Sequence, residues 1–257
     1  MTLKSNQLVG FGGGTSGGFT ASAVTFDGSN DYMTRAADFD SNSDGKTGIL
    51  SFWIKFNGGD GANQCPIWSD AAPTHLCRRD DNNVYYVYFR NAAVANRIGI
   101  VSNSQWTVSD GWHHVLSSWD AAVPQVHLYI NGSDDENSGY PTIKVDDTLD
   151  YTLADHHFMA DNNGGQKVNA DVAEFYMAFN QYVDISVAAN RLKFRTADGK
   201  PADLGTDGSA PTGSAPTLYC SVRPGDAASA FGTNRGTGGG LTITGSLTSA
   251  STSPSDD

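Results

Sequence analysis

Apolar and polar residues alternate with a period of two through the middle of this chain of 257 residues. In the segment 50–56, every second residue from Leu50 to Phe56 is a large apolar side chain, with Trp53 and Lys55 among the residues between them. Successive side chains of a β-strand point to opposite faces of a sheet, so this pattern predicts a strand with one buried face. We predict further strands at 84–89, 98–101, 113–119, 126–130 and 172–179.

Turn signals separate the predicted strands, with polar and glycine-containing clusters at 57–63, 79–83, 109–111 and 161–166. The dipeptide Asn131-Gly132 is typical of a hairpin turn. One helix is predicted, with Ser186 as its N-cap and with Gly199 and Pro201 ending it. Many short strands with a single helix indicate an all-β fold, an antiparallel sandwich of two sheets.

Segments unsuited to a core flank the predicted sandwich. Residues 10–18 contain six glycines, which are costly to order, and the tail 245–257 is polar throughout. We therefore predict a glycine-rich N-terminal arm at 1–20, a sandwich at 21–182, and a short helix with a C-terminal extension at 183–257. The extension would pack on or beside the sandwich, either as a separate cap or as its continuation.

The formal net charge of −12 disfavours nucleic acid as a partner, because an acidic surface repels phosphate groups. No apolar run approaches the roughly 20 residues of a membrane-spanning helix, and the N-terminus lacks the apolar segment of a signal peptide. Cys65, Cys77 and Cys220 lack metal-ligand spacing. We expect three thiols in a reducing cytoplasm, with a Cys65–Cys77 bridge as the alternative.

Two segments resemble one branch of a known superfamily. Residues 24–32 contain Phe26-Asp27-Gly28 followed by Asp31-Tyr32, which resembles an F-D-G-x-x-D-Y opening strand and turn. Residues 112–115 and 128–132 resemble a W-x-H-V…L-Y-I-N-G pattern. Both motifs are typical of the laminin-G/pentraxin-like branch of the concanavalin A-like lectin/glucanase superfamily. The resemblance covers about 21–182 and implies a jelly-roll β-sandwich.

A second resemblance lies further along the chain, at 181–184, 190–194, 199–201 and 233–239. These segments are similar to laminin-G-like proteins among phage and prophage structural genes. The similarity implies a structural virion protein, such as a capsid decoration, a head fibre or a tail-associated subunit, assembled in the host cytoplasm. Its partners would be other virion proteins and further copies of itself. The alternative is a carbohydrate-binding module for host-surface glycans.

Three aromatic residues are candidates for glycan binding: Trp53, Trp106 and Tyr129. Exposed rings can stack on the faces of sugars, and the strand or loop positions of these three would allow them to face outward. The alternative is that they belong to the core or to an interface.

Calcium is a second candidate ligand, because laminin-G and pentraxin relatives bind it with loop oxygens. Asp38, Asp40, Asn42 and Asp44 form an oxygen-rich segment that could wrap a hard cation. The segment is not an EF-hand, because Ser51 stands where the bidentate Glu would be. The alternative is a solvated acidic turn.

Asn169, Asp171 and Glu174 have the spacing of the E-x-D-x-x-E signature of family-16 β-glucanases, which share the expected fold. A retaining glycosidase needs a carboxylate nucleophile, and the amide of Asn169 cannot replace it. We therefore expect a protein that is not an enzyme. The adjacent pairs His113–His114 and His156–His157 would each face opposite sides of a strand and so cannot chelate one metal.

Overall fold

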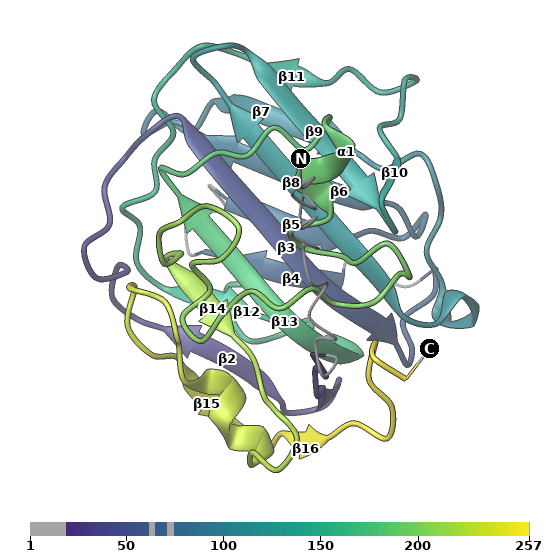
Figure 1. The fold of residues 1–257 in the computed structure, drawn as a ribbon. Helices are drawn as coiled ribbons and strands as arrows, with labels where there is room; N and C mark the ends of the chain where they lie inside the picture. Colours follow the sequence, from purple (N-terminus) through teal and green to yellow (C-terminus); the bar gives the residue numbers. More distant parts are fainter. Residues whose placement is uncertain (1–18, 62–64, 71–74, 257) are drawn as a thin grey trace, which may run out of the picture.

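The computed structural model describes residues 19–61, 65–70 and 75–256, and it shows two antiparallel sheets stacked face to face (Figure 1). This all-β sandwich with one short helix is the predicted fold class. In the first sheet the strand order is β10-β9-β8-β3-β13-β1-β16, and β14 also pairs with β13. In the second sheet the order is β11-β7-β6-β5-β4-β12-β2-β15.

The first sheet consists of β1 (Val24–Asp27), β3 (Thr47–Phe56), β8 (His113–Asp120), β9 (Gln125–Ile130), β10 (Ser133–Asp134), β13 (Asn169–Phe179), β14 (Leu218–Cys220) and β16 (Thr248–Ser249). The second consists of β2 (Tyr32–Arg35), β4 (Cys65–Ser69), β5 (His75–Arg79), β6 (Tyr85–Arg90), β7 (Asn96–Val101), β11 (Ile143–Lys144), β12 (His156–Phe158) and β15 (Thr242–Thr244). The helical elements are α1 (Ala188–Arg191) and the 3-10 turns η1 (Val108–Asp110) and η2 (Ala228–Gly232). No helix of the described part is long and apolar enough to cross a membrane.

The core lies between the two sheets, and the period of two determines which side chains enter it. Leu50, Phe52, Ile54 and Phe56 of β3 are all buried there, as their alternation predicts. The six segments predicted as strands all lie within or overlap strands of the structure. Cys65, Cys77 and Cys220 are free and buried, so the alternative of a Cys65–Cys77 bridge is wrong.

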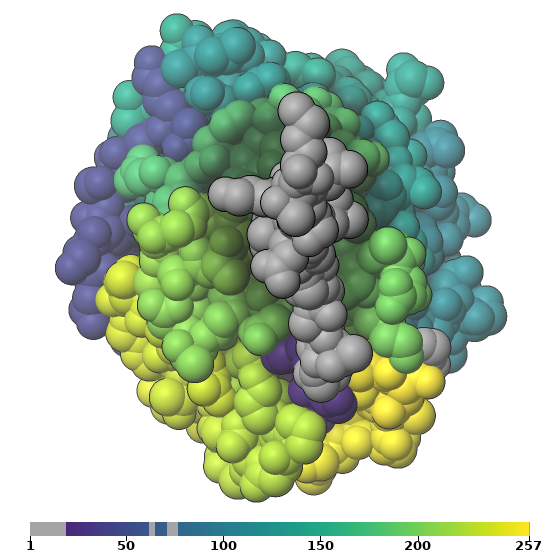
Figure 2. Space-filling view, in the orientation of Figure 1, coloured from purple at the N-terminus to yellow at the C-terminus, as the bar shows by residue number. Residues whose placement is uncertain are grey.

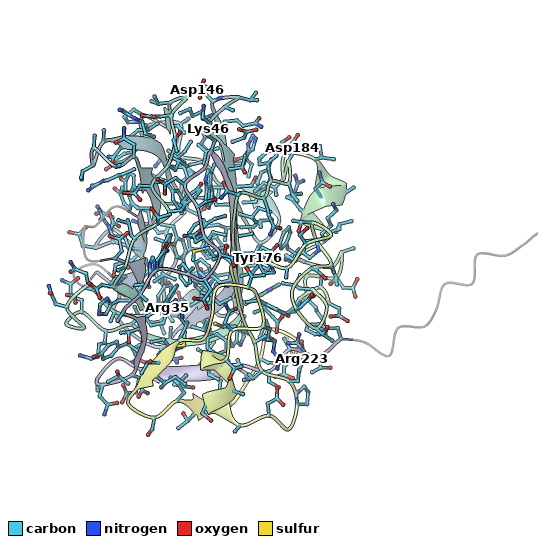
Figure 3. The ribbon with its side chains drawn as sticks, turned by 90° about the vertical axis from the view of Figure 1, so that its left-hand side faces the viewer. Arg35, Lys46, Asp146, Tyr176, Asp184 and Arg223 are labelled. Carbon is cyan, nitrogen blue, oxygen red and sulfur yellow. The ribbon has the colours of Figure 1, made fainter. Side chains whose placement is uncertain are left out.

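The outer face of the first sheet is also buried, because the chain after β13 packs over it. Val183, Ile185 and Phe194 cluster against Tyr176 and Leu116. Figure 2 shows residues of the C-terminal part, coloured green to yellow, over much of this side, and Figure 3 shows Asp184 and Arg223 there as well. Residues 183–204 therefore cover part of the outer face of the first sheet.

The C-terminal part also continues the sandwich. β14 and β16 pair with β13 and β1 in the first sheet, and β15 pairs with β2 in the second. The polar tail is held in place, since Ala250 packs beside Trp53 and the backbone oxygen of Ser255 accepts a hydrogen bond from Lys200. Of the arm predicted at 1–20, residues 1–18 lie outside the described residues.

The predicted helix is much shorter than expected. α1 comprises four residues, and its N-cap is Val187 instead of Ser186. The hydroxyl of Ser186 instead donates to a carboxylate oxygen of Asp184 at 2.6 Å. The chain then turns so that Phe194 packs edge-on against Tyr176, at 5.5 Å between ring centroids. Packing on the sheet therefore overrides the local helical pattern.

Candidate functional site

A cavity of about 340 Å³ opens on the outer face of the second sheet. The strands β4, β5, β6 and β7 and the loop between β12 and β13 surround it. Core-facing side chains of β5 and β6, such as Cys77 and Val87, alternate with residues that line the cavity. The lining residues are Pro66, Ser69, Asp70, Arg78, Tyr88, Arg90, Asn96, Asp161, Asn162 and Gln166.

Arg78 is held against two tyrosine rings. Its guanidinium carbon lies 4.9 Å from the ring centroid of Tyr86, its partner across the β5–β6 ladder, and 6.0 Å from that of Tyr88. The two rings stack at 5.6 Å, and Tyr140 contacts Tyr86 edge-on at 6.1 Å. Within the described part of the chain, the buried Nε of Arg78 has no hydrogen-bond partner, and its guanidinium forms no ion pair. Because Arg78 lines the cavity, the terminal N–H groups of its guanidinium can be reached by a ligand, whereas the buried Nε cannot.

The other polar residues of the cavity supply both donors and acceptors. Arg90 is oriented by a hydrogen bond from its Nε to Oδ1 of Asn96 at 2.7 Å. Burial acts to raise the pKa of Asp161, but hydrogen bonds from backbone N–H groups of its own loop outweigh this and hold the pKa below its usual value. Two arginines and two aspartates, Asp70 and Asp161, thus balance in charge around the half-buried ring of Tyr88. The arrangement suits a neutral, polar ligand that has one apolar face.

The three predicted glycan-binding aromatics form no common surface. Trp53 is 3% exposed and stacks on His114, with 4.9 Å between ring centroids. Tyr129 is 8% exposed, and the guanidinium of Arg191 covers its ring at 4.3 Å. Trp106 stacks on a core histidine, and its Nε1 donates to Asp135 at 3.2 Å. Trp53 and Tyr129 therefore lack a ring face open to a sugar.

The four residues predicted to bind calcium make hydrogen bonds within the protein. Asp40 forms an ion pair with Arg35 at 2.8 Å, and Oδ1 of Asp44 accepts two backbone N–H groups of the β11–β12 loop. The amide nitrogen of Asn42 donates to Asp38 and to a backbone carbonyl. No group of three or more His, Cys, Asp or Glu side chains suited to a metal occurs among the described residues. In this structure the segment forms a hydrogen-bonded turn.

The two carboxylates of the glucanase-like segment are paired. Asp171 forms an ion pair with Lys55 at 3.0 Å. Glu174 lies at a register shift in β13 with a φ of 49°, and its oxygens accept from Tyr219 at 2.5 Å and Arg223 at 2.6 Å. Burial raises the pKa of Glu174, although Arg223 and Tyr219 counteract part of this effect. Asp171 therefore links β13 to β3 within the first sheet, and Glu174 links β13 to the C-terminal region.

The adjacent histidines of β8 face opposite sides of the sheet, as predicted. His113 hydrogen-bonds Tyr85 at 2.7 Å in the core, and His114 hydrogen-bonds Ser51 at 2.8 Å on the other face. Desolvation lowers the pKa of His113 to about 4 and that of His114 to about 3. Both rings are therefore neutral near pH 7 and serve as packed, hydrogen-bonded residues.

Sequence reasoning did not identify Arg78, Tyr88 or Arg90 as site residues. One signal for them was present, because the segment 85–89 is aromatic or apolar on both faces. One explanation of this pattern is a strand that the protein itself buries on both faces. The other is a ligand bound on the outer face. The register that places Arg78 opposite Tyr86 comes from the fold and not from the sequence.

The stacked sheets and the polar, aromatic cavity define a lectin-like β-sandwich. The profile of the concanavalin A-like lectin/glucanases superfamily, in its laminin-G form, matches residues 26–181, and the chain belongs to this superfamily. No curated protein sequence matches the chain.

Solved structures share the fold at low sequence identity. A proposed carbohydrate-binding protein from Bacteroides ovatus is 13% identical, with a TM-score of 0.61 over 91% of this chain and 61% of its own. This chain therefore spans less than two thirds of the Bacteroides protein. A heptameric SAP-like pentraxin from Limulus polyphemus is 11% identical, with a TM-score of 0.49 over 72% of this chain and 87% of its own. The mouse laminin alpha1 domains LG4-5 are 14% identical, with a TM-score of 0.41 over 66% of this chain and 45% of their own.

Proposed function

We propose that the chain binds carbohydrate and that a sugar residue occupies the cavity on the outer face of the second sheet. The observation that carries this proposal is the guanidinium of Arg78, which lies in that cavity against Tyr86 and Tyr88 without an acceptor among the described residues. The apolar face of a pyranose would pack on Tyr88, and its hydroxyl oxygens would accept hydrogen bonds from Arg78 and Arg90. Asp161 would accept hydrogen bonds from its hydroxyl groups in return.

The proposal agrees with the covering of the first sheet. Arg191 covers the ring of Tyr129 and Ala250 packs beside Trp53, so both rings are removed from the ligand-accessible surface. The Bacteroides ovatus protein, which has the same fold, is itself a proposed carbohydrate-binding protein. Few, well-placed polar groups beside an aromatic ring are typical of small-molecule sites.

A glycan array, run with and without calcium, would identify a ligand, and calorimetry would then test the site. We expect Tyr88→Ala and Arg78→Ala each to weaken the affinity about tenfold or more, since a charged hydrogen bond is worth about 1.5–3 kcal/mol. Lys46→Ala is the control, because Lys46 pairs with Asp146 at one end of the sandwich (Figure 3). An array without hits, or variants that bind as tightly as the wild type, would refute the proposal.

We further propose that binding is not followed by hydrolysis. Asn169 stands where a nucleophilic carboxylate would be needed, and Glu174 is committed to Arg223 and Tyr219. The measurement is the release of reducing sugar from β-glucans. Release by the wild type that is lost in Glu174→Gln would contradict this part of the proposal.

We also propose that the chain is a component of a phage particle, where a glycan-binding sandwich would contact the host surface. Support comes from the resemblance of 181–239 to phage structural proteins and from the packing of 183–204 as a cover on the sandwich. The partners would be other virion proteins and further copies of the chain. Mass spectrometry of purified particles should detect the protein, and its absence would exclude this localisation.

A further inference from the structure

A second cavity, of about 220 Å³, lies between α1 and the turn that joins β9 to β10. Figure 1 shows α1 on the outer side of the first sheet, near these strands. Asn131, Gly132 and Ser133 line the cavity from the turn, and Arg191, Arg195 and Thr196 line it from the covering segment. It is thus on the sheet opposite the proposed carbohydrate site.

The charge of this cavity is the reverse of that of the chain. The formal net charge is −12, yet among the described residues that line the cavity only the two arginines are charged. Asp184 and Asp198, the nearest carboxylates along the covering segment, form no ion pair with either arginine in the described part of the chain. The described residues thus supply no carboxylate that forms an ion pair with either arginine.

Among the described residues, the guanidinium of Arg195 has no hydrogen-bond acceptor. Its guanidinium lies beside two glycines: a Cβ at Gly132 would be 3.4 Å from Nη1, and a Cβ at Gly199 would be 2.8 Å from Nη2. Its Nε is buried and has no hydrogen-bond partner among the described residues. Arg195 lines the cavity, so a ligand oxygen there would accept from its terminal N–H groups, whereas the buried Nε cannot be reached.

Arg191 is positioned by different contacts. Its Nη1 donates to the backbone oxygens of Ile185 at 2.7 Å and Ser186 at 2.9 Å, and its guanidinium packs on the ring of Tyr129 at 4.3 Å. Within the described part, its Nη2 and Nε make no hydrogen bond and remain as donors. Two guanidinium groups that are already oriented lose little freedom on binding an anion.

We propose that this cavity is an oxyanion site that binds a sulfate or phosphate group between Arg191 and Arg195. The hydroxyl of Ser133, at the rim, supplies a further donor. Guanidinium groups bind such groups through paired N–H donors. The site is independent of the carbohydrate cavity, so either can exist without the other.

Thermal unfolding of the full chain in sulfate, phosphate or chloride at equal ionic strength tests the proposal. Sulfate and phosphate should raise the Tm above its value in chloride, and calorimetry should give saturable binding. Arg195→Gln should weaken this binding at least tenfold, whereas Lys46→Gln should leave it unchanged. Equal Tm values in all three salts, or equal affinity in Arg195→Gln, would overturn the proposal.

A second variant keeps the test valid if Arg195→Gln does not fold. Ser133 is exposed, so Ser133→Asp would place a carboxylate at the rim while both arginines stay in place. This variant should fold and lose sulfate binding, and retained binding would contradict the site. Glucose 6-phosphate, compared with inorganic phosphate, separates a site for a sugar ester from a site for the free ion.

Discussion

Removal of Arg223 would leave the carboxylate of Glu174 buried without its positive partner. The side chain of Glu174 is 2% exposed, and that of Arg223, which is labelled in Figure 3, is 25% exposed. Breaking a buried ion pair by removing one member typically costs about 3–5 kcal/mol. Tyr219 would still donate to Glu174, so we expect Arg223→Leu to lower the free energy of unfolding by about 3 kcal/mol at pH 7.

The opposite substitution is predicted to be milder. Glu174→Gln removes the buried charge but keeps an acceptor, and the partly exposed Arg223 can be hydrated, so its cost should be about 1 kcal/mol. The double variant Glu174→Gln, Arg223→Leu has no buried charge. It should therefore be more stable than Arg223→Leu alone, which makes it the matched control.

The pH dependence gives a second measure of the same pair. Burial raises the pKa of Glu174 in the folded protein, and loss of Arg223 removes a positive charge that lowers it. A raised folded-state pKa favours the protonated carboxyl, so the cost of Arg223→Leu should be small near pH 4–5 and grow as the pH rises. Urea unfolding of all four proteins at pH 5 and pH 8 measures this. A cost that is equal at both values, or a double variant less stable than Arg223→Leu, would refute the reasoning.

Three further predictions concern the core. The folded-state pKa values of His113 and His114, about 4 and about 3, lie below the unfolded-state value. The free energy of unfolding should therefore fall as the pH drops from about 6.5 towards those values. An NMR titration that shows either ring protonating near pH 6.5 in the folded protein would contradict this. Gly48→Ala should destabilise the protein by about 1–3 kcal/mol in urea unfolding, because its Cβ would lie 2.1 Å from the ring of Trp119, whereas Gly240→Ala, with 3.8 Å to its nearest contact, should not. The three buried thiols should react with a thiol reagent only after denaturation, and rapid reaction of the native protein would exclude their burial.

The strands could be predicted from the sequence because their signal is local. The alternation from Leu50 to Phe56 reports the inner face of β3 directly, since successive side chains point to opposite faces. The outer face could not be predicted in the same way. Ala250 packs beside Trp53, and the guanidinium of Arg191 covers the ring of Tyr129. Both contacts come from residues far along the chain, so no local sequence pattern indicates them.

The site was missed for a related reason. Arg78 and Tyr88 belong to different strands, and only the register of β5 against β6 brings Arg78 to the tyrosines of one face. The length of the helix was overestimated. The spacing of apolar residues after Ser186 is helical, but the packing of Phe194 against Tyr176 requires a turn. Contacts distant in sequence therefore decided both the site and the helix.

The claim that the cavity beside Tyr88 binds a sugar is tested most directly by a crystal structure of the chain with the strongest glycan from the array. The account predicts a sugar ring packed on Tyr88, with a hydroxyl oxygen within hydrogen-bond distance of the guanidinium of Arg78. A sugar bound on the covered first sheet, or at a loop remote from this cavity, would contradict it.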